Sequence, residues 1–393
     1  MSPTNPPLGR PLRMALIGGG GSGFIGRVHA AAALLDRRAQ LVAGALSSLP
    51  DRAQAAAAEF GIEPDRAFGS YRELIDFASR LPPDQRIDFV TVATPNHTHF
   101  PIAHAALQAG LNVVCEKPMT VDLGQAQTLA RLVEETGAVF ALAHAYSAFP
   151  LVRQAREMVH SGELGTVQAV RVHYLQGGLR GLVPGQPPPR AAWKADPSLA
   201  GPSGAMSDIG THAYHLTCFV TGLAPRAVSC HLRTYHPARP LDDYGHAVIR
   251  FEGEALGTLT VSQATHGRLN DLSLEVDGTA GSLAWRQEAP DQLVVRRFGQ
   301  PVQVYERSTR AGYLSGAGRA ACRLPGGHPE GLLEAFANLY CDCFDAMVLR
   351  ATGHAAVLRD SRYPNVHAGL AGVLFVQQCL SSHRADGAWM PLC

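Results

Sequence analysis

Lysine, aspartate and histidine occur in two short motifs that could handle a proton. Lys117 stands in EKP (116–118), and Asp208 and His212 stand in SDIGTH (207–212). Residues four apart share one helical face, so a helix would hold the carboxylate and the imidazole together. Histidine titrates near neutral pH and neighbours can bring a lysine there, whereas an arginine stays charged. The motifs predict acid–base chemistry. The alternatives are a surface turn at Lys117 and an amphipathic helix with a polar outer face.

The position of Lys117 in the chain strengthens this prediction. Only two lysines, Lys117 and Lys194, occur among 34 basic residues. Val113 and Val114 indicate the end of a buried parallel strand, and Pro118 cannot continue it, so the chain must turn. Open α/β sheets bind their ligands at the carboxyl ends of the strands, which is where this turn falls.

A glycine-rich stretch near the amino end has the spacing of a dinucleotide-binding turn. GSGFIG (21–26) lies between an apolar strand at 12–17 and a helical pattern that ends near residue 35. Glycines let the backbone approach a pyrophosphate, and the helix that follows offers free N–H groups. Extra glycines at 18–20 lengthen the loop, and the alternative is a glycine-rich linker. The predicted cofactor contacts here are Gly18, Gly21, Gly23, Phe24, Ile25 and Gly26.

The end of the second strand bears on the choice of cofactor. NAD-binding turns usually carry an acidic residue there, whereas this chain has Ser47 and Ser48, with Arg52 four residues on. Hydroxyls and an arginine tolerate a 2′-phosphate better than a carboxylate does. We therefore expect NAD or NADP, with a slight preference for NADP.

The motif TPNHTH (94–99) follows a buried strand at 87–93. It reaches the same edge of the sheet, so we expect it near the nicotinamide ribose. A zinc site is the alternative for the two histidines, but no third ligand lies nearby in the sequence, and we predict no metal. The predicted cofactor contacts here are Thr94, Pro95, Asn96 and His99.

Strands alternate with helical patterns through the first third of the chain. This alternation predicts βαβ units and a parallel sheet, which is an α/β Rossmann domain. We expect a disordered lead at 1–10, the Rossmann domain at 11–147 and a second domain at 148–393. The predicted strands are 12–17, 40–46, 87–93, 113–114 and 138–143, with a strand–helix pair at 67–79; the predicted helices include 50–60 and 122–136.

The pattern changes after residue 150. Strand-like runs punctuated by Gly and Asp predict an α+β domain with a large, mainly antiparallel sheet that packs one face on helices. Two loops, 177–202 with six prolines and 313–328, are long enough to be functional. The predicted strands are 167–174, 227–232, 246–251, 256–263, 272–276, 293–298 and 302–305; the predicted helices are 151–160, 204–221, 329–349 and 366–383.

Composition excludes several classes of protein. The chain of 393 residues is 46% hydrophobic and 17% charged with a net charge of +1, and no basic run points to nucleic acid or an anionic membrane. No apolar run is as long as a membrane helix, and the proline-rich start lacks the apolar core of a signal peptide. The eight cysteines show no CxxC spacing, so we expect free thiols and a cytoplasmic protein.

Together these motifs resemble the Gfo/Idh/MocA family (glucose–fructose oxidoreductase, inositol dehydrogenase, rhizopine catabolism). The resemblance spans nearly the whole chain and includes a closing helical segment that runs from 361 to 389. The motifs that carry it are GSGFIG (21–26), TPNHTH (94–99), EKP (116–118), WKAD (193–196) and SDIGTH (207–212).

The resemblance implies a role for each matching residue. Lys117 corresponds to the lysine that touches the reacting hydroxyl and the nicotinamide ribose, Asp208 to the aspartate that helps hold substrate, and His212 to the general acid/base. Glu116 supports the cofactor pocket. The Lys-Pro bond of EKP can be cis in relatives. The implied substrate contacts are Lys117, Tyr146, Trp193, Lys194, Asp208 and His212.

The resemblance implies an NAD(P)-dependent oxidoreductase that acts on a sugar, sugar derivative or cyclitol, and a homodimer or homotetramer formed through the second domain. A glycosidase that uses NAD transiently and a non-catalytic sensor are the alternatives. Three departures line the expected substrate side, which indicates that the substrate differs from that of the best-known members. They are GPSG (201–204) for a triple glycine, AHAYS (143–147) without an arginine, and Lys194 in place of arginine.

Overall fold

The computed structural model describes residues 8–21, 23–178, 192–237, 239–354 and 361–392, which group into two compact units. Each unit is built from several stretches of chain. Unit 1 comprises Met1–Thr120, Gly124–Ala143 and Phe336–Leu370, and unit 2 comprises Val121–Leu123, His144–Ala335 and Ala371–Cys393. The lead predicted at 1–10 lies outside the described residues as far as residue 7.

Unit 1 holds a parallel sheet in the order β2-β1-β3-β4-β5. The central strand β3 reads FVTVA and is buried at every position, as a strand covered on both faces requires. The carboxyl ends of β1, β3 and β4 therefore lie along one edge. The strands are β1 (Leu12–Gly18), β2 (Ala39–Ala45), β3 (Phe89–Ala93), β4 (Asn112–Cys115) and β5 (Phe140–Leu142).

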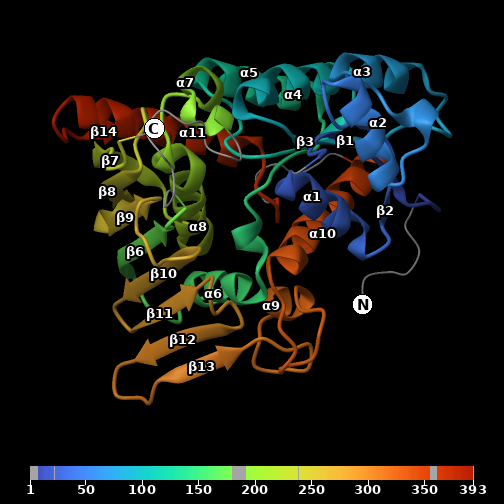
Figure 1. Cartoon of the computed structure of the whole chain (residues 1–393). Coiled ribbons are helices and arrows are strands. Elements are labelled where there is room, and N and C mark those ends of the chain that lie inside the picture. Colours follow the sequence, from blue (N-terminus) through green and yellow to red (C-terminus); the bar gives the residue numbers. More distant parts are fainter. Residues whose placement is uncertain (1–7, 22, 179–191, 238, 355–360, 393) are drawn as a thin grey trace. The chain divides into compact units, whose positions relative to one another are not determined.

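Helices cover both faces of this sheet (Figure 1). One face carries α3, α4 and α5, and the other carries α1 and α10, whose Tyr340 and Phe344 pack on Phe89 of β3. Ser70 begins α3 by accepting the N–H of Glu73, which is one half of a capping box. The helices of unit 1 are α1 (Phe24–Leu35), α2 (Pro50–Glu59), α3 (Tyr71–Arg80), α4 (His99–Gln108), α5 (Leu123–Thr136) and most of α10 (Leu332–Ala351), with 3-10 turns η1 (Pro64–Arg66) and η2 (Asn96–Thr98). The helix α11 (Val366–Arg384) begins in unit 1 and belongs to unit 2 from Ala371 on.

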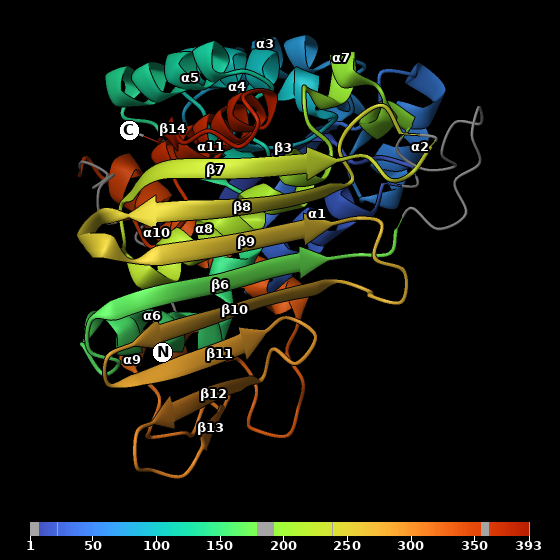
Figure 2. The ribbon, with the colours of Figure 1, turned by 90° about the vertical axis from the view of Figure 1, so that its left-hand side faces the viewer.

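Unit 2 is built on a sheet in the order β13-β12-β11-β10-β6-β9-β8-β7-β14 (Figure 2). Neighbouring strands run antiparallel except for the parallel pair β6 and β9. The strands are β6 (Val167–Leu175), β7 (Pro225–Arg233), β8 (Tyr244–Phe251), β9 (Leu256–Ser262), β10 (Asp271–Gly278), β11 (Gly281–Arg286), β12 (Gln292–Arg297), β13 (Gln303–Glu306) and β14 (Met390–Pro391).

One face of this sheet forms the core of unit 2, and α6 and α8 lie behind it in Figure 2. Along β8 every second side chain is buried, as the two-residue period of a strand with one covered face requires. The helical elements are η3 (Ala145–Ala148), α6 (Pro150–His160), η4 (Ala192–Ala195), α7 (Pro197–Ala200), the π-helix η5 (Met206–Gly210), α8 (Thr211–Thr221), η6 (Glu252–Glu254) and α9 (Gly316–Ala320).

The predicted fold class is confirmed, with local differences. The strand expected near residue 67 is reduced to a single bridge between Gly44 and Ala67. The sequence prediction lacks β11, because its Gly281 and Ser282 give it little strand character; it forms between β10 and β12. Phe336–Leu370 belongs to unit 1, whereas the sequence analysis expects all of 148–393 in the second domain. No helix in the described residues is long and apolar enough to span a membrane.

Candidate active site

Several glycines fix the path of the chain after β1. Gly18 has a φ of +82°, and a Cβ there would lie 2.4 Å from the carbonyl oxygen of Ala93. A Cβ on Gly26 would lie 2.4 Å from the Gly19 Cα, so the first turn of α1 touches the loop backbone to backbone. Gly21 has open space around it but a φ of +67°. A Cβ on Gly20 would lie 2.6 Å from the carbonyl oxygen of Leu46, so the close approaches fall on Gly18, Gly19, Gly20 and Gly26.

The amino end of α1 is suited to an anion. Gly23 begins the helix, no acidic residue lies in the first turn, and among the described residues no side chain caps it. The first N–H groups and the helix dipole therefore face outward beside exposed Phe24. Arg27 crosses the loop, donating to the carbonyl oxygen of Gly21 at 2.9 Å. A cradle that a Cβ would fill, beside uncapped N–H groups, fits a dinucleotide pyrophosphate.

The end of β2 lies against this loop, because the N–H of Gly20 donates to the carbonyl oxygen of Leu46 at 3.2 Å. Ser47 follows and is half-buried, whereas Ser48 and Arg52 are exposed. The structure thus places Ser47 next to the residue that bonds the glycine loop.

His99 ties two loops together. It is fully buried, and its ring nitrogens lie 2.8 Å from the carbonyl oxygen of Pro118 and 2.9 Å from that of Thr94. Burial lowers the pKa of His99, against the opposite effect of the two carbonyl groups. Both nitrogens face backbone acceptors, so this side chain supports the turn after Lys117.

The remainder of TPNHTH lies at the same edge of the sheet. Asn96 is buried, and the Thr98 hydroxyl donates to Thr94 Oγ1 at 2.8 Å. His97 Nδ1 is buried and has no hydrogen-bond partner in the described structure. Within the same described ranges, no group of three or more His, Cys, Asp or Glu residues is arranged to hold a metal ion.

A buried polar chain supports Glu116. Its Oε2 accepts the N–H of Lys117 at 3.1 Å, and its Oε1 lies 3.1 Å from His29 Nε2. The other ring nitrogen of His29 lies 2.8 Å from the hydroxyl of Tyr340, which lies 3.0 Å from Thr91 Oγ1. A carboxylate only accepts, so His29 donates from Nε2, and in its neutral form Nδ1 accepts from Tyr340.

This chain of contacts sets the charge of Glu116. Burial acts to raise the pKa of the Glu116 carboxyl, but the hydrogen bond and charge of His29, with Lys117 and His99 beyond it, leave that pKa below its ordinary value. The carboxylate is therefore ionised next to half-buried Lys117. The Lys117–Pro118 bond is cis, as the resemblance implies.

In unit 2, Asp208 lies on the π-helix η5. Its Oδ2 accepts from Lys194 Nζ and from Gln263 Nε2, each at 2.9 Å. The side chain is 22% exposed, and the ammonium group of Lys194 also lies 5.8 Å from the centre of the Trp193 ring. Single π-turns within helices are frequent at functional sites.

His212 lies one turn further, on α8, and is 8% exposed. Its Nδ1 is 3.0 Å from Nδ1 of His144. The ring of Tyr146 meets it edge-on with centres 4.9 Å apart. The two helical motif residues and two of their predicted neighbours, Tyr146 and Lys194, thus lie in one part of unit 2.

A cluster of hydroxyl and amide groups adjoins His212. The hydroxyl groups of Tyr146 and Tyr174 are 2.5 Å apart, and Asn270 contacts both of them. Burial, with Tyr146 and Asp208 nearby, raises the pKa of Tyr174 well above its usual value, so it stays protonated and can donate. Sequence reasoning missed Tyr174, Gln263, Asn270 and His144, because the fold brings them to the helix from segments far away in the sequence.

Asp242 anchors the start of η5. Its carboxylate accepts from the Ser203 hydroxyl at 2.8 Å, the Gly204 N–H at 2.7 Å and the Met206 N–H at 2.9 Å. The departure from a triple glycine at 201–204 therefore supplies a serine hydroxyl to this anchor. No sequence motif marks Asp242 as the partner of this segment.

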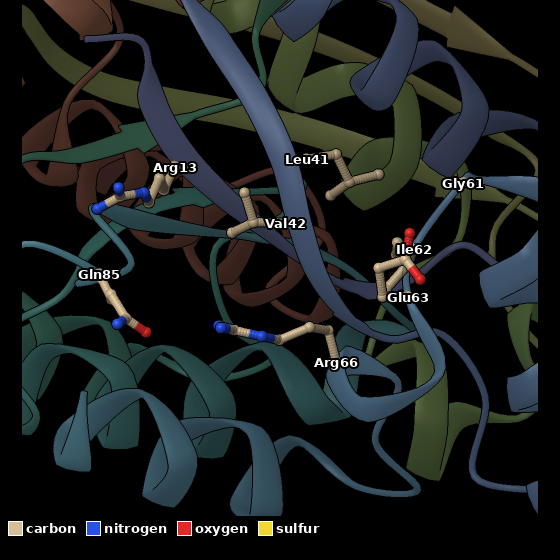
Figure 3. Close-up of a pocket in the computed structure, with 8 residues that line it drawn as sticks. All are labelled: Arg13, Leu41, Val42, Gly61, Ile62, Glu63, Arg66 and Gln85. Atoms are coloured by element: carbon tan, nitrogen blue, oxygen red, sulfur yellow. The ribbon is translucent and has the colours of Figure 1, made fainter.

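Unit 1 also has a cavity of about 430 Å³ away from the glycine loop (Figure 3). Arg13, near the amino end of β1, lines it, whereas the glycine loop leaves the carboxyl end. Arg66 extends toward Gln85 in this cavity, and Glu63 lies at its rim. None of the residues predicted to contact the cofactor lines it.

Comparison with known proteins agrees with the geometry. Residues 12–144 match the model of an oxidoreductase family with an NAD-binding Rossmann fold, and residues 152–284 match the GFO/IDH/MocA C-terminal domain. An inositol dehydrogenase homolog from Azotobacter vinelandii, solved with NAD+, is 38% identical with a TM-score of 0.92 over 97% of each chain.

Two further relatives indicate a ligand, one through its bound molecules and one through its name. The inositol dehydrogenase homolog of the same organism, solved with NADH and myo-inositol, is 36% identical with a TM-score of 0.90 over 97% of this chain and 98% of that one. The levoglucosan dehydrogenase of Pseudarthrobacter phenanthrenivorans is 31% identical over 72% of this chain and 76% of its own length. The chain belongs to the Gfo/Idh/MocA family and is an NAD(P)-dependent oxidoreductase.

Proposed function

We propose that this oxidoreductase acts on one CH–OH group of a cyclic polyol or sugar, and that Lys117, Asp208 and His212 carry the chemistry. The observation that carries this proposal is the set of side chains around one helix in unit 2. Asp208 is held by Lys194 and Gln263, and His212 is buried one turn away beside Tyr146. Closely spaced donors and acceptors beside aromatic rings suit a ring with several hydroxyl groups.

The ligands of the relatives support this substrate class. Myo-inositol and levoglucosan are both rings that carry several secondary hydroxyl groups, and they occur in relatives that match most of this chain. The departures at 143–147, 194 and 201–204 support a substrate that differs in detail from those of the best-known family members.

Each residue has a stated role in the proposed oxidation. The nicotinamide of NAD or NADP supplies the hydride acceptor when bound. The carbinol C–H bond breaks with its electron pair leaving as hydride, and His212 takes the hydroxyl proton. Lys117 stabilises the developing alkoxide with its ammonium group, and Asp208 holds neighbouring hydroxyl groups. Glu116 and His99 fix the turn that carries Lys117.

The test is a panel of cyclitols, sugars and anhydrosugars with NAD+ and NADP+, followed by nicotinamide absorbance. Wild type should reduce the cofactor with at least one ring polyol. His212→Ala and Lys117→Ala should each lower kcat about 10²- to 10⁴-fold, the range that acid–base help supplies, and still bind the dinucleotide. Turnover of a glycoside without net NADH would instead assign the NAD-dependent glycosidase, and an inert wild type that binds cofactor would indicate a sensor.

The cofactor preference, assembly and location belong to the same proposal. Ser47, Ser48 and Arg52 support NADP slightly over NAD, and titration with NADH and NADPH decides between them. The open face of the unit 2 sheet supports a homodimer or homotetramer. The seven cysteines in the described residues form no disulfide with one another, which supports a reducing compartment such as the cytoplasm.

A further inference from the structure

Three histidines form a column in unit 2. The His144 ring lies flat on His215, with centres 4.5 Å apart and an angle of 7° between the planes. It meets His212 edge-on, with the two Nδ1 atoms 3.0 Å apart. His144 and His212 are nearly or fully buried, at 1% and 8% exposure. His144 comes from the segment that follows β5, so the sequence alone does not pair it with α8.

A hydrogen bond between two imidazole nitrogens needs one proton. One Nδ1 must donate and the other must accept, because two bare nitrogens or two N–H groups at 3.0 Å repel. If His212 is to take a proton from substrate at Nε2, its own proton must lie on Nδ1. The His144 Nδ1 then accepts, and His144 carries its proton on Nε2.

We propose that His144 is a positioning residue that fixes the tautomer and orientation of His212, so that Nε2 of His212 is the atom that exchanges a proton with substrate. This inference rests on the proposed role of His212. It assigns to an imidazole the orienting task that a carboxylate performs in serine hydrolases.

The choice of imidazole has a consequence for pH dependence. A carboxylate in this place would stabilise the imidazolium form of His212 and raise its pKa, whereas a neutral imidazole adds no negative charge. His215, on the far side of His144, stays neutral because burial, with the charge of Arg156, lowers its pKa to about 3. Tyr146 and Tyr174 face His212 from η3 and β6, and Asp208 lies on the preceding turn.

Substitutions at His144 can separate the effect of its hydrogen-bond acceptor from the effect of its size. An asparagine places its Oδ1 the same number of bonds from Cβ as Nδ1, so His144→Asn keeps an acceptor for His212. His144→Leu has similar bulk and no acceptor. The kcat of His144→Leu should be roughly 10- to 100-fold below that of wild type, which is part of the acid–base contribution. The kcat of His144→Asn should stay within about threefold of wild type. The KM for the dinucleotide should stay unchanged in both.

The pH profile gives a second, independent readout. His144→Asp should move the acidic limb of kcat/KM to higher pH, because the added carboxylate favours protonated His212, which cannot act as the base. His144→Leu in a His212→Ala background should cause no further loss of kcat, since the orienting residue has nothing left to orient. If His144→Leu fails to fold, His144→Gln takes its place. The amide of glutamine lies one bond further from Cβ than Nδ1 does, so it does not place an acceptor at the Nδ1 position.

Each outcome has a distinct meaning. Full activity of His144→Leu, with His212→Ala inert, would overturn the positioning role and leave the proposed function standing. An equal loss in the asparagine and leucine variants, with an unshifted pH profile, would mean that His144 only packs. Full activity of His212→Ala would overturn the proposed function itself.

Discussion

At the scale of single residues, the glycine loop needs glycine for two different reasons. Some positions have no space for a Cβ, and others have a positive φ. A Cβ at Gly26 would meet the backbone of Gly19, and neither side can yield without moving α1 or the loop. Gly26→Ala should therefore weaken dinucleotide binding at least about tenfold, which corresponds to roughly 1.4 kcal/mol. Fluorescence titration with NADH and NADPH measures it.

The matched control is Gly21→Asn. Gly21 has a positive φ but no atom within 4 Å of a Cβ, and asparagine tolerates that backbone conformation. It should bind the dinucleotide nearly as wild type does. Equal weakening in both variants would show that the loop tolerates no side chain at all, contrary to the geometry.

His215 makes the stability of the protein sensitive to acid. Its folded-state pKa of about 3 lies below the ordinary 6.5, so its contribution is complete above pH 6.5 and is lost as the pH falls toward 3. Between pH 7 and pH 5, the free energy of unfolding should fall by about 2 kcal/mol through this group. His215→Phe keeps a ring against His144 and should remove that part of the pH dependence in urea unfolding curves. An unchanged pH dependence would contradict the neutral state of half-buried His215.

At the scale of elements, Tyr340 links α10 to α1 and to the middle of β3. Its hydroxyl lies between His29 and Thr91, so Tyr340→Phe leaves two buried polar groups without that partner. The free energy of unfolding should fall by about 1–3 kcal/mol, and dinucleotide binding should weaken because Glu116 loses its fixed neighbour. Urea unfolding and NADH titration measure the two effects.

A second buried tyrosine of unit 1 serves as the control. The Tyr363 hydroxyl makes no side-chain hydrogen bond within the described ranges, and Tyr363 is 5% exposed. Tyr363→Phe should change neither quantity by much. If both variants behave alike, the polar chain from α10 to Glu116 does not support the site.

Periodicity and motifs predict most elements of this fold because each signal is local. Apolar runs at 12–17 and 87–93 and the turn at Pro118 are visible without any partner. The strand β11 is not, because its backbone pairing with β10 and β12, rather than its composition, makes it a strand. Likewise, Asp208 and His212 could be predicted from helical spacing, whereas Gln263 and His144 approach them from distant segments.

At the scale of the whole molecule, the outward face of the unit 2 sheet is the proposed subunit contact. Val248 points to that face from β8, which lies between β9 and β7, and the neighbouring Ala247 and Ile249 are buried on the other face. Val248→Arg should convert the proposed dimer or tetramer toward monomer by placing a charge in the contact, as sedimentation velocity would measure. Leu269→Arg, at a position 84% exposed, is the control and should leave the assembly intact. A monomeric wild type would contradict the proposal.

Hydride transfer from a ring carbinol is the central claim, and isotope transfer tests it most directly. The ring polyol that the panel identifies is deuterated at its carbinol carbons and incubated with the oxidised cofactor, and the reduced nicotinamide is analysed by mass spectrometry. We predict one deuterium per reduced cofactor, a slower turnover than with the undeuterated polyol, and no transfer by His212→Ala above its low residual rate. Product formation without deuterium in the nicotinamide would contradict the account.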